Sequence, residues 1–258
     1  MDPSEISSPQ QSLRQAAARS WKETADGEGA WKATLRLAGT LWEFARDSTP
    51  ERLRARFGDA EYDWEHRVNT TSGAVGWHDR LLGMFHSPYQ PTEPALFHEM
   101  LDTLLEHARA EWTGFSFADF TFIDLGSGKG RTLLMATDYP FRRVMGVELL
   151  PSLHAIALEN LAAYRAESQK CFALQAVCGD AAEFDFPHEP VVLYLFNPLP
   201  KVGLRRVVAN LERSLREHPR AVYVLYHNPL LEGVVAESTS LRRVGGTHQY
   251  AIYASGIR

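Results

Sequence analysis

The sequence contains only two cysteines, Cys171 and Cys178, among its 258 residues. Two cysteines exclude a scaffold built from several disulfides and a zinc site with four cysteine ligands. The ten histidines include no pair spaced four apart around an acid, which is a pattern typical of zinc enzymes. We therefore expect no metal ion in this protein.

Long apolar runs are lacking as well. The longest one, Val191–Phe196, is far shorter than the ~20 residues that span a bilayer. The first ten residues, MDPSEISSPQ, do not combine a basic start with an apolar stretch, so they differ from a secretory signal. These absences predict a cytoplasmic protein without a membrane partner.

The sequence has no excess of basic residues. It contains 27 Lys and Arg against 32 Asp and Glu, for a formal net charge of −5. This balance argues against a protein held to nucleic acid by bulk charge, and we expect no nucleic-acid partner. Hydrophobic residues at 45% and charged residues at 23% match ordinary globular composition, so the length fits one large domain, or one domain with an appendage.

The second part of the chain, residues 119–258, alternates between short apolar runs and helical stretches. Continuous apolar strands that alternate with helices indicate a parallel sheet covered on both faces. We predict an α/β fold with a doubly wound, mostly parallel seven-stranded sheet and an antiparallel last strand, preceded by a helical and loop-rich extension over 1–118. Strands are expected at 120–125, 143–148, 172–178, 191–196, 221–226, 239–244 and 249–254, helices at 129–138, 151–165 and 202–217, and a hairpin turn at 245–246.

A glycine-rich loop, Asp124–Arg131 with the sequence DLGSGKGR, follows the first predicted strand. Ligands of open parallel sheets bind beyond the carboxyl ends of the strands, where this loop must lie. The next strand ends at Glu148, 24 positions after Asp124, and a carboxylate placed there can accept both hydroxyls of a ribose. A dinucleotide fingerprint needs its third glycine at position 131, which is arginine here, so a nicotinamide-dependent oxidoreductase is the disfavoured alternative.

The G-x-G-x-G spacing resembles the first motif of class I S-adenosylmethionine-dependent methyltransferases, and the resemblance extends over residues 119–258. It implies S-adenosyl-L-methionine as the cofactor, with Glu148 on the ribose, Asp180 on the adenine amine and the loop along the methionine portion. Without the resemblance, Asp180 could instead be a solvent-facing helix cap. The cofactor contacts implied in this domain are Asp124, Gly126, Ser127, Gly128, Gly130, Glu148 and Asp180.

After the fourth strand the chain reads Asn197-Pro198-Leu199-Pro200. In the family this position lies beside the transferring methyl group, so the resemblance makes Asn197 a candidate catalytic residue, although an ordinary turn remains an alternative. Subfamilies that methylate a planar nitrogen carry a second proline and an aromatic residue here. Their absence puts a planar-nitrogen acceptor in doubt.

Upstream of the motif domain stands Tyr89-Gln90-Pro91-Thr92, followed by a predicted amphipathic helix. This order resembles lysine methyltransferases built without a SET domain, in which the upstream element folds over the cofactor. The resemblance implies that residues 1–118 include a cofactor lid, with Tyr89 and Thr92 near the methionine end of the ligand. It makes Thr92 a cofactor contact, and Tyr89 a candidate catalytic residue that helps to shape the acceptor pocket. It favours a protein lysine or another amine as acceptor, with a small molecule next. A methyltransferase-like binding protein without turnover remains the second alternative.

Overall fold

The computed structural model describes residues 18, 21–22, 25–26, 29–35, 37–38, 60–71, 91–197 and 199–256. A seven-stranded sheet with the order β3-β2-β1-β4-β5-β7-β6 forms its centre. Neighbouring strands are parallel except for β7, which runs antiparallel to β5 and β6 between them. The strands are β1 (Thr121–Leu125), β2 (Arg143–Glu148), β3 (Leu174–Cys178), β4 (Val191–Leu195), β5 (Val222–His227), β6 (Leu241–Gly246) and β7 (Tyr250–Ser255). The predicted fold class is confirmed.

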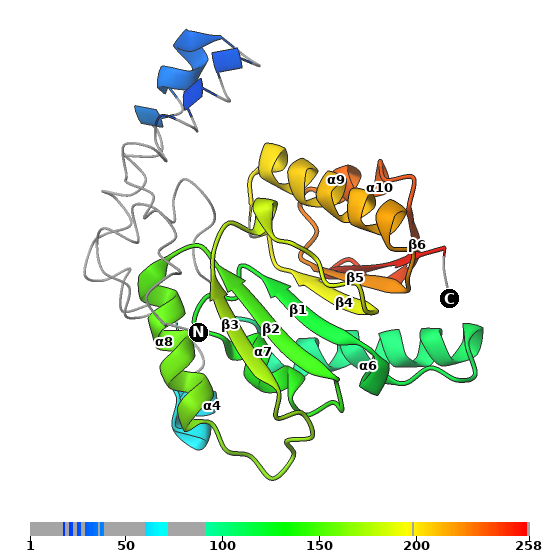
Figure 1. The fold of residues 1–258 in the computed structure, drawn as a ribbon. Coiled ribbons are helices and arrows are strands. Elements are labelled where there is room, and N and C mark those ends of the chain that lie inside the picture. The colour runs from blue at the N-terminus through cyan, green and yellow to red at the C-terminus, as the bar shows by residue number, and fades with distance from the viewer. Residues whose placement is uncertain are drawn as a thin grey trace, which may run out of the picture.

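Helices cover both faces of the sheet (Figure 1). The right-handed connections of a doubly wound sheet place α7 and α8 on one face and α9 and α10 on the other. Two apolar cores result, one beneath α6 and α7 and one beneath α9 and α10. Among the described residues from 60 onward, the helices are α4 (Ala60–His66), α6 (Pro94–Glu111), α7 (Arg131–Ala136), α8 (Pro151–Ala163), α9 (Lys201–Glu217) and α10 (Glu232–Ala236), with short 3-10 helices η1 (Phe117–Asp119) and η2 (Ala181–Glu183).

The central strands are buried along their whole length. Every residue of β1, β4 and β5 is buried, as expected for continuous apolar runs between two helical layers. The edge strand β3 is only partly buried, and it begins two residues later than predicted. Phe172, in the predicted run, is 77% exposed, so an aromatic residue at the sheet edge did not mark strand structure there.

Helix α6, the amphipathic helix predicted after Thr92, begins at Pro94 and packs its apolar face on β1 and β4. The ring of Phe97 meets the rings of Phe122 on β1 and Tyr194 on β4 edge-on, with centroids 5.9 Å and 5.7 Å away. The start of α6 therefore brings Thr92 to the carboxyl end of β4.

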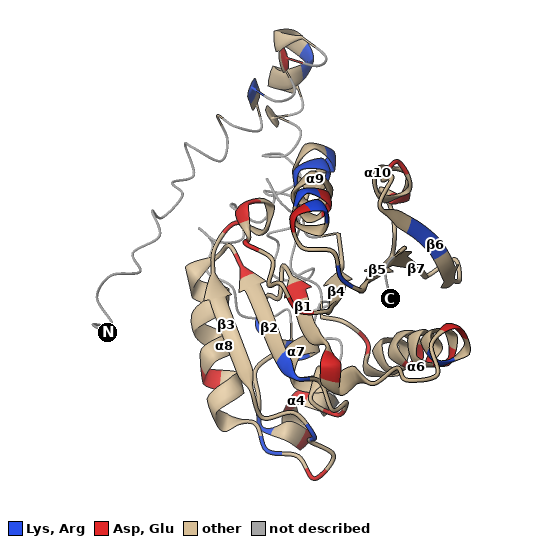
Figure 2. Ribbon diagram, turned by 45° about the vertical axis from the view of Figure 1, so that its right-hand side comes forward, with Lys and Arg blue, Asp and Glu red and all other residues tan. Residues whose placement is uncertain are grey.

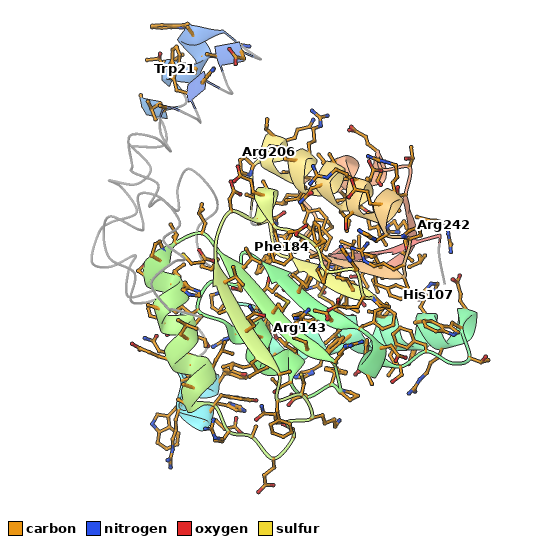
Figure 3. The ribbon with its side chains drawn as sticks, viewed as in Figure 1. Trp21, His107, Arg143, Phe184, Arg206 and Arg242 are labelled. Atoms are coloured by element: carbon orange, nitrogen blue, oxygen red, sulfur yellow. The ribbon has the colours of Figure 1, made fainter. Side chains whose placement is uncertain are left out.

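Figure 2 shows basic residues along the ribbon of α9, and the lysine and arginines of this helix are all exposed: Lys201, Arg205, Arg206, Arg213 and Arg216. Arg206 projects from this helix and pairs with Glu183 of η2 at 3.0 Å (Figure 3). Arg205 pairs with Glu237 at 3.4 Å. The exposed cations of α9 are thus partly neutralised by neighbouring acids, as expected for a solvated helix face.

The turn of the last hairpin differs from the prediction. Gly245 and Gly246 belong to the end of β6, and the turn follows at 247–249, where the Thr247 N–H donates to the carbonyl of Tyr250 at 2.8 Å. Gly246 has a φ of 117°, and a Cβ there would lie 2.3 Å from the Tyr250 carbonyl oxygen. Glycine is needed at this position for close backbone approach beside a bulge in β6, not for the turn itself.

The domain boundary predicted after residue 118 falls inside η1, and α6, upstream of it, packs on the sheet. None of the described helices is long and apolar enough to cross a lipid bilayer.

Candidate functional site

The loop between β1 and α7 is shaped by three glycines in left-handed conformations. Gly126, Gly128 and Gly130 have φ angles of 88°, 54° and 85°, which side-chain-bearing residues rarely adopt. The N–H groups of Gly126 and Ser127 both donate to the Val147 carbonyl on β2, at 2.8 Å and 3.1 Å. The loop is therefore tied to the end of β2, while its glycines leave the backbone bare for a ligand.

Ser127 faces the sheet. Its Oγ is buried without a hydrogen-bond partner, and a Cβ on Gly146 of β2 would lie only 2.6 Å from that atom. Gly146 is thus the residue that makes room for the Ser127 side chain. Cofactor contact by Ser127, which stays a prediction, would come from its backbone.

Glu148 ends β2 with its carboxylate against the glycine loop. Oε2 accepts from the Gly128 N–H and Oε1 from the Leu150 N–H, both at 2.8 Å. Burial raises the pKa of Glu148, and hydrogen bonds from backbone N–H groups oppose this rise by stabilising the ionised form. The carboxylate is held in place beside the loop, with lone pairs left for further donors.

Asp124, at the base of the loop, is buried and accepts a hydrogen bond from the Thr132 hydroxyl on α7. Burial raises the pKa of Asp124 to about 7, the Thr132 hydrogen bond lowers it, and the neighbouring Glu148 carboxylate raises it further. Two buried carboxylates at one edge of the sheet make this region suited to a ligand that carries a positive charge.

Asp180 follows β3 and caps η2, since its Oδ1 accepts from the Ala182 N–H at 2.9 Å. The helix cap that the sequence allowed as an alternative role for Asp180 is therefore present. Adenine binding by Asp180 stays a prediction. A Cβ built on the preceding Gly179 would meet nothing within 4 Å. Open space thus lies against the backbone at the end of β3, next to Glu148.

Asn197 follows β4 and clamps it to the end of β5. Its Oδ1 accepts from the Tyr226 hydroxyl at 2.9 Å, and its Nδ2 donates to the Asn228 carbonyl at 2.6 Å. Asn197 and Asn228 both have left-handed φ angles, 45° and 46°. The amide is used to hold the strand ends, and a catalytic role for Asn197 stays a prediction.

A buried polar row crosses the strand ends beneath α6. The Tyr194 hydroxyl lies 2.9 Å from Thr92 Oγ1 and 2.8 Å from His227 Nδ1. Asp124 on β1 is the register partner of Tyr194 on β4. Hydrogen bonds of the row link β4 and β5 to the segment before α6, so Thr92 is placed by the Tyr194 hydroxyl. A cofactor contact by Thr92 stays a prediction.

His227 is a neutral member of this row. Burial lowers the pKa of its imidazole to about 4, and its ring stacks on Phe196 with centroids 3.9 Å apart. Tyr194 keeps its proton because burial and the nearby Asp124 carboxylate raise its pKa. Sequence reasoning missed Tyr194, because a tyrosine in an apolar strand gives no sign that its hydroxyl is buried.

The remaining predicted site residue, Tyr89, lies outside the described residues. Among the described residues, no group of three or more His, Cys, Asp and Glu side chains could hold a metal ion.

Comparison with known proteins gives fold-level likenesses. No family model matches the chain, and no curated protein matches it. An RNA methyltransferase from Salinibacter ruber, solved with S-adenosyl-L-homocysteine, is 23% identical over 65% of this chain and 94% of its own, with a TM-score of 0.42. The glycopeptide N-methyltransferase MtfA with S-adenosyl-L-methionine is 18% identical (61% and 64% coverage, TM-score 0.36), and a predicted N6-adenine-specific DNA methylase from Listeria monocytogenes is 15% identical (65% and 52%, TM-score 0.42).

Proposed function

We propose that this protein is a methyltransferase that uses S-adenosyl-L-methionine. The observation that carries the proposal is the meeting of the Glu148 carboxylate and the Gly128 backbone at the carboxyl edge of the sheet. This edge, beside the first strand of a doubly wound sheet, is where such folds bind nucleoside ligands. The three left-handed glycines and the open space at Gly179 provide room for a ligand there.

In this proposal the ribose hydroxyls donate to Glu148, and the adenine lies toward β3 and Asp180. The methionine portion lies along the glycine loop, where its ammonium approaches the buried Asp124 carboxylate. These residues fit the cofactor. Burial disfavours the ionised forms of Asp124 and Glu148, and a positively charged ligand offsets that cost. The cofactor supplies an activated methyl group, and the chain supplies position and exclusion of water.

The cations of the loop argue against the dinucleotide alternative. The Lys129 ammonium donates to Asn69 Oδ1 and to the Thr71 carbonyl, and the Arg131 guanidinium donates to Asp63 and Thr70. Both side chains are buried against the upstream segment, so they are used there and not as pyrophosphate ligands. A cofactor without phosphate groups suits this arrangement better.

The acceptor side lies across the ends of β4 and β5, where Asn197 and the neutral His227 stand. An uncharged imidazole and a protonated Tyr194 offer hydrogen bonds without net charge. A nucleophile that arrives protonated would need a base that takes its proton. The lysine or amine acceptor drawn from the upstream motif gains no support, since Tyr89 is outside the described residues. The solved structures named above act on unlike acceptors by their names, so we propose the reaction without an acceptor class and leave nucleic acid open.

Isothermal calorimetry with S-adenosyl-L-methionine and with NAD⁺ tests the cofactor. We expect S-adenosyl-L-methionine to bind and NAD⁺ not to bind. We also expect a large loss of affinity for S-adenosyl-L-methionine in Glu148→Ala. The matched control is Glu183→Ala, which removes an exposed carboxylate from η2. Unchanged affinity in Glu148→Ala would refute the ribose assignment, and binding of NAD⁺ alone would refute the proposal.

Turnover is tested with a radiolabelled methyl donor and host lysate, separated into protein, nucleic acid and small molecules. Label in one fraction identifies the acceptor class. Cofactor binding without label in any fraction would favour the binding protein without turnover.

A further inference from the structure

The upstream segment Tyr62–Thr71 is folded around one carboxylate. Asp63 Oδ2 accepts from the N–H groups of Thr70 and Thr71, at 2.7 Å and 2.8 Å, and Asp63 Oδ1 accepts from the Thr70 hydroxyl. The Val68 N–H donates to the Asp63 carbonyl at 3.0 Å. Four donors on Asp63 fix the turn that leads out of α4.

Arg131, the first residue of α7, is bound from the same segment. Its Nε donates to Thr70 Oγ1 at 2.7 Å, and its Nη2 lies 3.3 Å from Asp63 Oδ1. Its guanidinium carbon lies 4.7 Å from the centre of the Tyr62 ring. Nη1 reaches the Thr92 carbonyl at 3.5 Å. Only 2% of Arg131 is exposed, so its charge depends on these partners.

Lys129, on the other side of Gly130, is bound in the same way. Its ammonium donates to Asn69 Oδ1 at 3.0 Å and to the Thr71 carbonyl at 2.6 Å. Asn160 of α8 closes the arrangement, since its amide exchanges two hydrogen bonds with the Asn69 backbone and donates to the Lys129 carbonyl at 2.9 Å. Side chain and backbone of Lys129 are thus both held.

We propose that Asp63, Asn69, Thr70 and Thr71, here called the polar clasp, position the cofactor loop through Lys129 and Arg131. The residues of the clasp do not touch the cofactor in this proposal, which rests on the function proposed above. They act on the peptide units around Gly130, whose neighbours Lys129 and Arg131 are both anchored outside the ligand site. The segment Tyr62–Thr71 is therefore a working part of the cofactor site, although it precedes the motif domain by about fifty residues.

The physical reason lies in the glycines. A loop with three glycines loses much conformational freedom when it is fixed, and a ligand that must fix it loses affinity accordingly. Anchors on both sides of Gly130 fix the loop before the ligand arrives, which raises affinity without adding a contact. Gly128, whose N–H donates to the Glu148 carboxylate, is adjacent to Lys129 in the chain. Loss of the polar clasp therefore also releases this carboxylate.

Thr70 gives the sharpest test, because Thr70→Val keeps the shape of the side chain and removes the hydroxyl, while Thr70→Ser keeps the hydroxyl. Asp63→Asn removes the charge that pairs with Arg131. The control is Arg143→Gln, which breaks the ion pair of Arg143 with Glu189 at the amino end of β2 (Figure 3). Each full-length variant is titrated with S-adenosyl-L-homocysteine by calorimetry, and amide hydrogen exchange is followed over residues 126–131.

We expect Thr70→Val and Asp63→Asn to weaken S-adenosyl-L-homocysteine binding at least about fivefold and to speed exchange over residues 126–131. Thr70→Ser and Arg143→Gln should match the wild type in both measurements. Near-wild-type affinity and exchange in Thr70→Val would overturn the proposal, and so would an equal loss of affinity in Arg143→Gln, because that would reflect general destabilisation. If Asp63→Asn does not fold, the Thr70 pair decides.

The two proposals fail in different ways. If the wild-type protein binds no S-adenosyl-L-homocysteine, the proposed function fails, and the exchange of residues 126–131 in the ligand-free Thr70 variants still tests the clasp. If the wild type binds and the Thr70 variants do not differ, the clasp proposal fails and the proposed function stands.

Discussion

Asp124→Asn should stabilise the ligand-free protein at pH 8 and weaken the binding of S-adenosyl-L-methionine. Burial raises the pKa of Asp124 from 3.8 to about 7 in the folded state, so ionising this carboxylate at high pH works against folding. Asparagine has no charge to bury, and its side-chain oxygen can still accept from Thr132. The same substitution removes the negative charge that we propose faces the ammonium of the cofactor.

The direction and size of the stability difference between the variant and the wild type follow from the pKa of Asp124 in the unfolded and folded states. Below pH 3.8 the carboxyl is protonated in both the folded and the unfolded states, so the variant gains nothing. Between pH 4 and pH 7 only the unfolded state is ionised, and wild-type stability falls relative to the variant as pH rises. Above pH 7 the full difference applies, about three pKa units or up to roughly 4 kcal/mol.

Ligand binding should show the opposite dependence. If the cofactor needs Asp124 ionised, wild-type affinity rises roughly eightfold between pH 6 and pH 7.5, as the fraction of ionised Asp124 grows. The variant should bind more weakly at pH 7.5 and lack this rise.

Thermal unfolding from pH 4 to pH 8 and calorimetry at pH 6 and pH 7.5 measure both effects. Asp185→Asn, at an exposed acid, is the control. A melting temperature for Asp124→Asn that is no higher than the wild type at pH 8 would refute the burial argument. A wild-type affinity independent of pH would refute the assignment of the ammonium.

Three further predictions concern packing and the polar row. Gly146→Ala should destabilise the protein by about 1–3 kcal/mol in urea unfolding, because its Cβ would meet Ser127 Oγ at 2.6 Å, whereas Gly179→Ala, with open space around its Cβ, should show no such overpacking cost. Tyr194→Phe should lower stability by about 1–3 kcal/mol at pH 7, since it leaves buried polar partners unsatisfied, and an unchanged unfolding midpoint would contradict this. In NMR titrations the His227 imidazole should stay neutral at pH 6 and take up its proton near pH 4; a midpoint near its ordinary 6.5 would show that the ring is not desolvated.

The sheet could be predicted from sequence because its strands are continuous apolar runs. Buried strands between two helical layers need apolar side chains on both faces, and that pattern marked β1, β4 and β5 within one residue at each end. The loop and Glu148 were predicted for a related reason, since glycines after a strand and an acid at the next strand end are local signals. The structure places them in contact, through the Gly128 N–H.

The polar row and the polar clasp could not be predicted, because their partners are far apart in the chain. Thr92 meets Tyr194 over 102 positions, and Arg131 meets Asp63 over 68. Threonine, tyrosine and aspartate are common residues, and nothing in their local sequence tells a buried hydroxyl or carboxylate from an exposed one. In the same way, the sequence identified Arg131 as the wrong residue for a dinucleotide motif and left its partner unknown.

The position of β7 in the sheet affects how the chain can fold during synthesis. This strand is synthesised after β6, yet it lies between β5 and β6 and supplies hydrogen bonds to both. Its Ser255 hydroxyl also accepts from the Val222 N–H at the start of β5. On the ribosome, β5 must therefore wait with an unpaired edge until residue 255 has emerged. A nascent chain stalled before that point would present an open, apolar strand edge, the kind of surface that chaperones cover and that pairs with neighbouring chains.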